Sequence, residues 1–258
     1  MSELPDLRTD TSDRVLTITF ARPAKKNALT LAMYDAMTAA LVRARDDAQI
    51  RVVLIRGSEG CFTAGNDLLD FMQNPPTSAD SPVGRFLELW VSFPKPIVAA
   101  VEGVAIGVGT TMLLHCDLVY AAPNTRFQLP FVPLGLTPEA GSSLLLTQLC
   151  GHQRAAELLL LGEPFDGARA LELGMINRVV DPEALHAWAR ERALKLATLP
   201  PASIRLTKHL MRAPTRAALE AAMLEESTRF FERLRSPEAA EAMSAFFARR
   251  TPDFSRFE

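Results

Sequence analysis

One carboxylate and two glycine-bearing segments hold the residue types that could move a proton beside a carbonyl group. Glu139 is the carboxylate, while Gly65 and Gly107 directly precede Asn66 and Val108. Because glycine tolerates tight backbone turns, each could leave the N–H group of the next residue free to point into a cleft. Two such donors stabilise the oxyanion that forms when a carbonyl compound loses an α-proton. The pattern therefore predicts lyase or isomerase chemistry with neither a metal nor a covalent nucleophile.

The same residues also permit purely structural roles. Gly65 could be an ordinary turn residue, and Gly107 could allow close helix packing. Glu139 follows a Thr-Pro pair, so it could equally stand in the first turn of a helix, where the helix dipole favours an acid. Neither glycine segment has the spacing of a phosphate loop or a dinucleotide-binding loop. The 4 histidines and 3 cysteines are widely spaced, which predicts neither a metal site nor a disulfide framework.

Alternating strand and helix patterns position these residues up to about residue 180. Apolar residues alternate with threonine at Val15–Phe20, as in a strand with one buried face, and Thr30 suits the N-cap of a helix over 31–45. A second helix is predicted over 105–115. Short buried strands are predicted at Val52–Arg56, Ile97–Val101 and Leu118–Ala121. This alternation is typical of the α/β class, with crossover units on a largely parallel sheet.

After Val180 the pattern becomes helical. Helices are predicted over 182–199, 203–211, 216–234 and 237–249. Such a region could support assembly or could simply form a packing layer. Residues 71–83, which include three prolines, predict a mobile loop near the first glycine segment. We therefore divide the chain into a core with the site, 1–195, and a helical C-terminal region, 196–258.

Composition limits the class of protein. The 258 residues are 48% hydrophobic, which is enough for a sizeable core. A formal net charge of −2 gives no reason to expect nucleic acid or an anionic membrane as a partner. The first residues lack the basic and apolar regions of a secretory signal, and no apolar stretch is long enough to span a bilayer. We expect a cytoplasmic protein with reduced thiols.

Five ordered motifs together resemble the enoyl-CoA hydratase/isomerase (crotonase) superfamily. They are RPAKKNAL at 22–29, FTAGNDL at 62–68, KPIVAAVEGVAIGVG at 95–109, CDLVYA at 116–121 and GEPFDGARALELGMINRVV at 162–180. The resemblance covers nearly the whole chain. It implies a spiral of ββα turns, a helical trimerisation region and an acyl-CoA thioester ligand in fatty-acid metabolism. It also implies a homotrimer or a dimer of trimers, and no cofactor apart from the coenzyme A of the substrate.

The resemblance assigns roles to particular positions. The family's oxyanion hole falls on the backbone N–H groups of Asn66 and Val108. A contact to coenzyme A from the C-terminal region falls on Phe246 and Arg249, which could reach the ligand of a neighbouring subunit. The remaining residues expected to bind substrate or coenzyme A are Lys25, Ala28, Ala64, Asp67, Leu68 and Phe131.

The count of carboxylates decides which reaction the resemblance implies. Hydratases of this family activate water with two glutamates, and the corresponding positions here are Thr111 and Phe131. Neither side chain can act as an acid or a base at neutral pH. The segment around Glu139 resembles the Δ3,Δ2-enoyl-CoA isomerase branch, with Ala140 where glycine more often follows the base. We therefore predict an isomerase with a single glutamate base. The alternatives are a hydratase, another crotonase-type lyase or hydrolase, or a non-catalytic member that binds coenzyme A or RNA.

Overall fold

A six-stranded sheet forms the centre of the protein in the computed structural model, which describes residues 4–75, 78 and 80–257. The strand order is β1-β2-β3-β4-β6-β8. The first two strands form an antiparallel hairpin and every later pairing is parallel, which confirms the predicted α/β class. The strands are β1 (Leu7–Ser12), β2 (Val15–Phe20), β3 (Val52–Arg56), β4 (Ile97–Val101), β6 (Leu118–Ala121) and β8 (Arg178–Val179).

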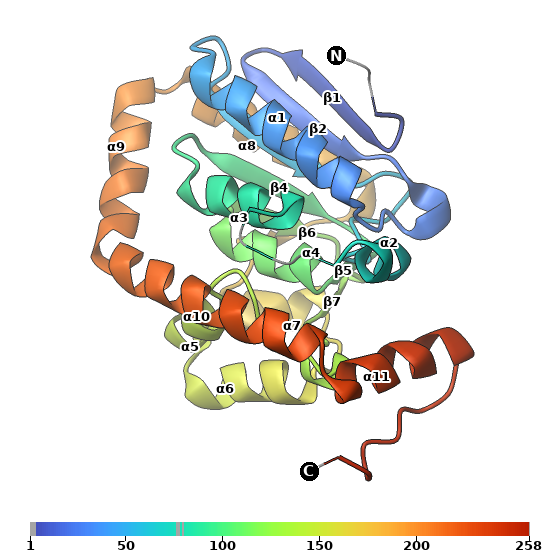
Figure 1. The fold of residues 1–258 in the computed structure, drawn as a ribbon. Coiled ribbons are helices and arrows are strands. Elements are labelled where there is room, and N and C mark those ends of the chain that lie inside the picture. The colour runs from blue at the N-terminus through green and yellow to red at the C-terminus, as the bar shows by residue number, and fades with distance from the viewer. Residues whose placement is uncertain (1–3, 76–77, 79, 258) are drawn as a thin grey trace.

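Helices cover both faces of this sheet (Figure 1). On one face, α1 (Leu31–Asp46) and α3 (Pro82–Ser92) pack in the larger apolar core. On the other face, α8 (Pro182–Thr198) packs a stripe of alanines against the strands. All five residues of β4 are buried, because a central parallel strand has apolar neighbours on both sides. The short continuous apolar runs of the sequence therefore became the inner strands, as predicted.

The predicted helix over 105–115 is wrong in its first turn. Residues Val104–Ile106 form strand β5, which pairs in parallel with β7 (Arg126–Gln128) in a second small sheet. Gly107 then adopts φ 57° and ψ −120°, a conformation essentially restricted to glycine, and so ends the strand sharply. Only after this turn does the chain become helical, in α4 (Val108–Thr111) and η2 (Met112–His115).

The predicted loop over 71–83 is also wrong at both ends. Its first residues belong to α2 (Leu68–Gln73), and its last belong to α3. Both helices have strong N-caps: Asp67 accepts from the N–H groups of Leu69 and Asp70, and Ser81 accepts from Gly84. Residues 76, 77 and 79 of the predicted loop lie outside the described residues.

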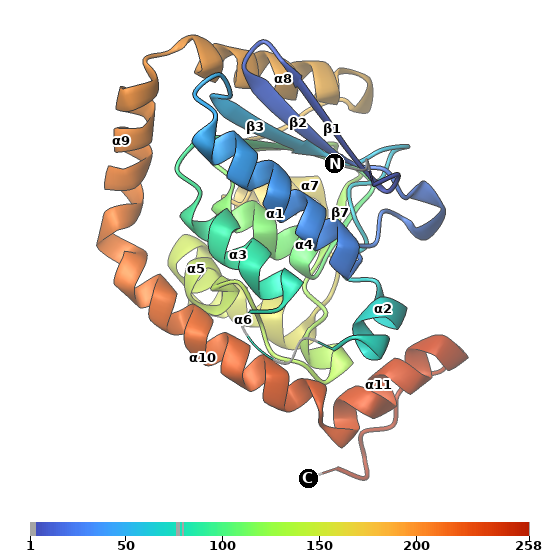
Figure 2. The ribbon, with the colours of Figure 1, turned by 45° about the horizontal axis from the view of Figure 1, so that its top comes forward.

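The last third of the chain is helical, as predicted. Helices α9 (Pro201–Arg212), α10 (Arg216–Leu234) and α11 (Pro237–Ala248) follow one another around the edge of the molecule, with α9 at the left, α10 along the bottom and α11 at the lower right of Figure 2. The proposed division at residue 195 falls in the last turn of α8, a helix that packs on the sheet. Among the described helices, none is both long and apolar enough to cross a membrane.

Short helices complete the chain between these elements. Between the small sheet and β8 lie η3 (Val132–Leu134), α5 (Ser142–Cys150), α6 (His152–Ala156), η4 (Glu157–Leu161) and α7 (Gly167–Glu172). Two further single turns are η1 (Pro23–Lys25) and η5 (Ala213–Thr215). The packing of α10 against α5 brings the C-terminal helices next to the segment that carries Glu139.

Candidate active site

Glu139 stands in an irregular segment between η3 and α5 rather than in a helix. The next two residues, Ala140 and Gly141, have φ values of 58° and 72°, and α5 begins only at Ser142. The alternative that Glu139 belongs to the first turn of a helix is therefore wrong. Protein atoms strip most water from its carboxyl group, and this burial raises its pKa to about 7. A carboxyl group with such a pKa can both accept and return a proton near neutral pH.

Thr111 contacts the Glu139 carboxylate directly. The buried Thr111 hydroxyl donates a hydrogen bond to Oε1 of Glu139. This bond lowers the pKa of Glu139, but the loss of hydration outweighs it. The sequence marked Thr111 only as a position without an acid, and it gave no sign that the hydroxyl would support the base from α4.

The two glycine segments lie side by side. Thr63 pairs with Ala105, and the N–H group of Ile106 donates to the Thr63 carbonyl at 3.2 Å. Gly65 has φ 86°, and a Cβ at this position would stand 2.5 Å from the carbonyl oxygen of Ile106. Glycine is therefore required here both by conformation and by the close approach of the neighbouring segment.

Gly107 is not the helix-packing glycine considered as an alternative. A Cβ there would meet nothing within 4 Å, whereas one on Gly109 would lie 2.6 Å from the side chain of Thr63. The role of Gly107 is instead its positive φ, which frees the next amide. Within the described part of the chain, the backbone N–H groups of Asn66 and Val108 donate to no protein acceptor. Two unpaired donors on adjacent segments are what an oxyanion site needs.

Tyr34 contacts the first glycine segment and lies near the base. Its buried hydroxyl donates to Oδ1 of Asn66 at 2.6 Å. Burial raises the pKa of Tyr34, and the nearby charge of Glu139 raises it further. Asn66 and Glu139 therefore share one neighbour in α1. Sequence reasoning missed Tyr34, because its place on the buried face of a helix gives no functional signal.

The residues expected to hold coenzyme A come from two adjoining loops. The N–H group of Ala64 donates to the carbonyl of Lys26 at 2.9 Å, and that of Asp67 donates to Leu29 at 2.8 Å. These bonds bring together the segments that contain Lys25, Ala28, Ala64, Asp67 and Leu68.

The Asp67 carboxylate already binds groups of the protein itself. It pairs with Arg22 at 2.6 Å and caps α2. Burial alone would raise the pKa of Asp67, but the hydrogen bonds from Arg22 and the α2 amides outweigh it and lower the pKa. Any contact of Asp67 with a ligand would therefore involve its backbone.

The other predicted binding residues are dispersed. Phe131 is buried at the start of η3. Phe246 is 59% exposed on α11, and Arg249 ends that helix with φ 53° and an exposed side chain. The roles of all three in substrate binding stay predictions.

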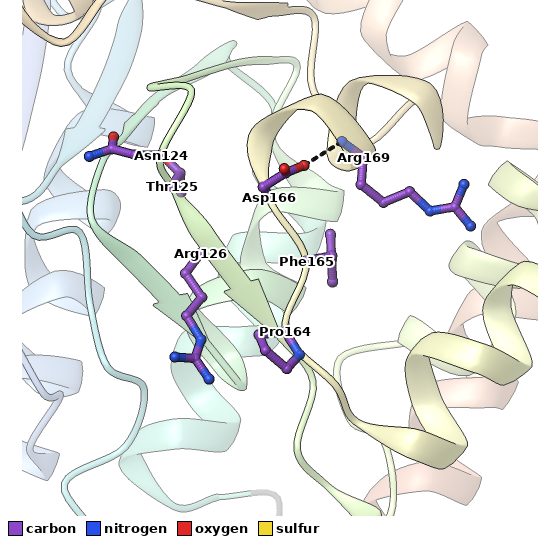
Figure 3. A pocket seen from close by; sticks show the side chains of 7 residues that line it. All are labelled: Asn124, Thr125, Arg126, Pro164, Phe165, Asp166 and Arg169. Carbon is purple, nitrogen blue, oxygen red and sulfur yellow. Dashed lines mark hydrogen bonds between the residues drawn. The ribbon is translucent and has the colours of Figure 1, made fainter.

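A surface hollow of about 530 Å³ lies elsewhere on the molecule (Figure 3). The Asp166 carboxylate in its wall accepts from the N–H group of Arg169 and thereby caps α7. The hollow contains none of the predicted site residues; its lining is Asn124, Thr125, Arg126, Pro164, Phe165, Asp166 and Arg169. Over residues 4–75, 78 and 80–257, no group of three or more metal-ligating side chains gathers.

Comparison with known proteins identifies the family of this chain. A model of the enoyl-CoA hydratase/isomerase family matches residues 10–256. The chain belongs to this family. Its two glycine segments and Glu139 thus lie in a crotonase-type fold.

Relatives in this family carry more than one activity. Enoyl-CoA delta isomerase 2 of Rattus norvegicus is 34% identical over 92% of this chain, which spans 62% of the rat protein. The 2,3-dehydroadipyl-CoA hydratase of Escherichia coli is 33% identical, with 98% and 99% of the two chains covered. The 1,2-epoxyphenylacetyl-CoA isomerase of the same organism is 36% identical, with 93% and 95% covered. Family membership therefore establishes an enzyme of the enoyl-CoA hydratase/isomerase type without selecting the reaction.

The architecture matches solved structures closely. The structure of Pseudomonas aeruginosa OdaA superposes with a TM-score of 0.91 at 49% sequence identity, over 93% of this chain and 98% of that one. The predicted crotonase-like fold with C-terminal helices is confirmed by this agreement.

Proposed function

We propose that the protein is a Δ3,Δ2-enoyl-CoA isomerase, which moves a double bond from C3 to C2 of an acyl-CoA. One observation carries the proposal: Thr111, at a position where a hydratase has a glutamate, donates a hydrogen bond from its hydroxyl group to the Glu139 carboxylate. The site thus pairs one acid with a neutral hydroxyl. Hydration by the usual family mechanism needs two acids to hold and activate water.

A second buried carboxylate nearby does not restore the hydratase pair. Glu226 lies close enough for its charge to raise the pKa of Glu139. Its oxygens, however, accept hydrogen bonds from the N–H groups of Gly141 and Ser143 and from the Ser143 hydroxyl. A carboxylate occupied in this way is poorly placed to activate a water molecule.

The proton is moved by Glu139 alone in this proposal. Its carboxylate removes a C2 proton from a 3-enoyl-CoA, which gives a dienolate spread from the thioester oxygen to C4. The resulting carboxylic acid then returns the proton to C4, and the 2-trans-enoyl-CoA forms. A pKa of about 7 keeps both forms of Glu139 populated near neutral pH, so both steps have a suitable catalyst.

The developing negative charge on the thioester oxygen is stabilised by the backbone N–H groups of Asn66 and Val108. Removal of one such donor in enzymes costs about 2.7–4 kcal/mol of transition-state stabilisation. The unpaired state of these two amides supports this role. Coenzyme A is part of the substrate, and the reaction as written requires no separate cofactor.

A comparison of two substrates tests the proposal. Purified protein should isomerise 3-hexenoyl-CoA much faster than it hydrates crotonyl-CoA. Glu139→Gln should abolish isomerisation and leave acyl-CoA binding intact, because the amide keeps the size of the side chain but cannot take up the proton. Near-wild-type turnover by Glu139→Gln would remove Glu139 from the mechanism, and fast crotonyl-CoA hydration would favour the hydratase alternative.

We also propose that the chain assembles as a homotrimer or a dimer of trimers. Helices α9 and α10 expose several large apolar side chains that a partner subunit could cover: Leu206, Leu210, Met211 and Leu224. Light scattering on the purified protein would measure the number of subunits. A monomer at micromolar concentration would contradict the assembly.

A further inference from the structure

Glu226 is a buried acid of α10 that contacts the segment bearing Glu139. Its carboxylate accepts from the N–H group of Gly141 at 2.5 Å and from the N–H group of Ser143 at 2.9 Å. It also accepts from the Ser143 hydroxyl at 2.5 Å. Glu226 is 7% exposed; its bond to Gly141 is buried, and its two bonds to Ser143 are partly buried. All three hydrogen bonds join the Glu226 carboxylate to the beginning of α5.

The beginning of α5 lacks a cap of its own. Its N-cap residue is Gly141, which has no side chain to satisfy the first amides of the helix. Glu226 supplies that cap from another helix, and the positive end of the helix dipole favours its charge there. From η2, Nε2 of His115 lies 2.7 Å from the carbonyl oxygen of Ala140. Residues 140–143 are thus held between η2 and α10.

We propose that Glu226 is a positioning residue, which fixes residues 140–143 and thereby aims the Glu139 carboxylate at the acyl-CoA substrate. This inference rests on the proposed function, in which Glu139 is the base. Glu226 does not touch the substrate; it acts through the amides of Gly141 and Ser143. A shift of about 1 Å in a catalytic group can cost about 100-fold in rate, so a rigid attachment of this segment matters for turnover.

The charge of Glu226 adds a second effect on the base. Burial raises the pKa of Glu139 most, and the charge of Glu226 raises it further. Burial raises the pKa of Glu226 itself, and the hydrogen bonds from Ser143 and Gly141 offset this in part, while three other groups near the base carry no positive charge. The Thr111 and Tyr34 hydroxyls are neutral, and burial lowers the pKa of His115 to about 4, so the imidazole is neutral as well.

Charged groups farther from the base have partners of their own. No residue of α5 or η5 is charged. On α10, Arg229 pairs with Glu225 and Glu232, and Arg233 pairs with Glu238 of α11. On α9, Lys208 pairs with Asp117, which also lies 3.7 Å from Arg212. Glu226 is therefore the charged group whose removal should change the titration of Glu139 most.

The test compares Glu226→Gln with Glu225→Gln, a matched change at the adjacent, exposed position of the same helix. Carbon-13 NMR of labelled glutamate follows the titration of Glu139, which is assigned by its loss in Glu139→Gln. We expect Glu226→Gln to lower the pKa of Glu139 and to reduce kcat for 3-hexenoyl-CoA by about 10–100-fold with little change in KM. Glu225→Gln should change neither quantity.

The two readouts separate this inference from the proposed function. If the wild-type protein does not isomerise 3-hexenoyl-CoA, the proposed function fails, while the NMR titration still tests the coupling of Glu226 to Glu139. An unchanged Glu139 titration in folded Glu226→Gln would overturn the inference. So would an activity loss that merely follows the fraction of unfolded protein.

A second pair of variants covers the case in which Glu226→Gln does not fold. Glu226→Asp keeps the charge but withdraws it from residues 140–143, so it should reduce kcat and alter the titration of Glu139. Ser143→Ala removes one hydrogen bond and leaves the charge in place, so it should preserve that titration. Wild-type kcat and titration in Glu226→Asp would overturn the inference.

Discussion

Replacing Thr111 by valine should move the pH dependence of catalysis towards higher pH. Valine matches the shape of threonine but removes the hydroxyl that donates to Glu139. This donor lowers the pKa of Glu139, so its loss should raise that pKa above the present value of about 7. A hydrogen bond to a charged group contributes about 1.5–3 kcal/mol, and one pKa unit corresponds to about 1.4 kcal/mol. The expected increase is therefore about 1–2 units.

The change in rate follows from the fraction of ionised base. With a pKa of about 7, about half of the Glu139 side chains are ionised at pH 7. After an increase of about 1–2 units only ~1–10% would be ionised, so kcat at pH 7 should fall by about 5–50-fold. The rate should recover as the pH rises towards 9, because at least about half of the Glu139 side chains are then ionised.

The assay is a pH profile of kcat for 3-hexenoyl-CoA isomerisation. Thr228→Val, at an exposed position of α10, serves as the matched control and should leave the profile unchanged. An acidic limb at the same pH in Thr111→Val and the wild type would refute the reasoning. It would mean that the hydroxyl does not interact with the carboxylate that limits the rate.

Further predictions concern stability and the oxyanion donors. The pKa of Glu139 rises from 4.5 unfolded to about 7 folded, so ionisation of this group costs stability as the pH rises through this window, up to about 3 kcal/mol. Glu139→Gln should therefore melt at a higher temperature than the wild type at pH 8 and at nearly the same temperature at pH 5. Equal melting temperatures at pH 8 would contradict the raised pKa of the buried Glu139. For His115 the pH dependence has the opposite sign, because folding lowers its pKa from 6.5 to about 4. Its contribution to stability is present above pH 6.5 and is lost as the pH falls from 6.5 to 4. His115→Gln should abolish this part of the pH dependence of the melting temperature. Gly65→Ala places a Cβ 2.5 Å from Ile106 and should displace the Asn66 amide, with a loss of about 100–1000-fold in kcat, while full activity would argue against this oxyanion donor.

The sequence predicted the inner strands well, because a buried strand appears in the sequence as a short run of apolar residues. Each residue of β4 is buried. A short, wholly apolar run between turn residues is typical of a central strand in a parallel sheet. The C-terminal helices were predicted because Ala, Leu, Glu and Arg, which dominate these stretches, have high helix propensity. Boundaries moved by a few residues, as at α9.

The missed elements share a different cause. Residues 105 and 106 were predicted as the start of a helix, but pairing with β7 places them in strand β5. The paired residues are 22 positions apart in sequence, and no local pattern predicts such a partner. The beginning of α3 lay next to a stretch rich in proline and serine, where Ser81 and Pro82 cap a helix instead of forming a loop. The secondary structure of these segments depends on tertiary contacts and helix caps more than on local propensity.

The catalytic roles of the named site residues stay predictions, and the sequence missed the side chains that contact them. Glu139, Asn66 and Val108 were chosen by type and by the glycines before the two amides. The contacts of Thr111, Tyr34 and Glu226 were not found, because each side chain reaches the site from a different element. Glu226 is 85 residues from Gly141 in sequence, and only the packing of α10 against α5 brings them together.

The central claim is that one carboxylate moves the proton from C2 to C4. The most direct test uses 3-hexenoyl-CoA deuterated at C2, with NMR and mass analysis of the product formed in ordinary water. We predict 2-trans-hexenoyl-CoA that carries deuterium at C4, transferred by Glu139. A hydroxylated product, or an isomerised product whose C4 carries only solvent hydrogen, would contradict it.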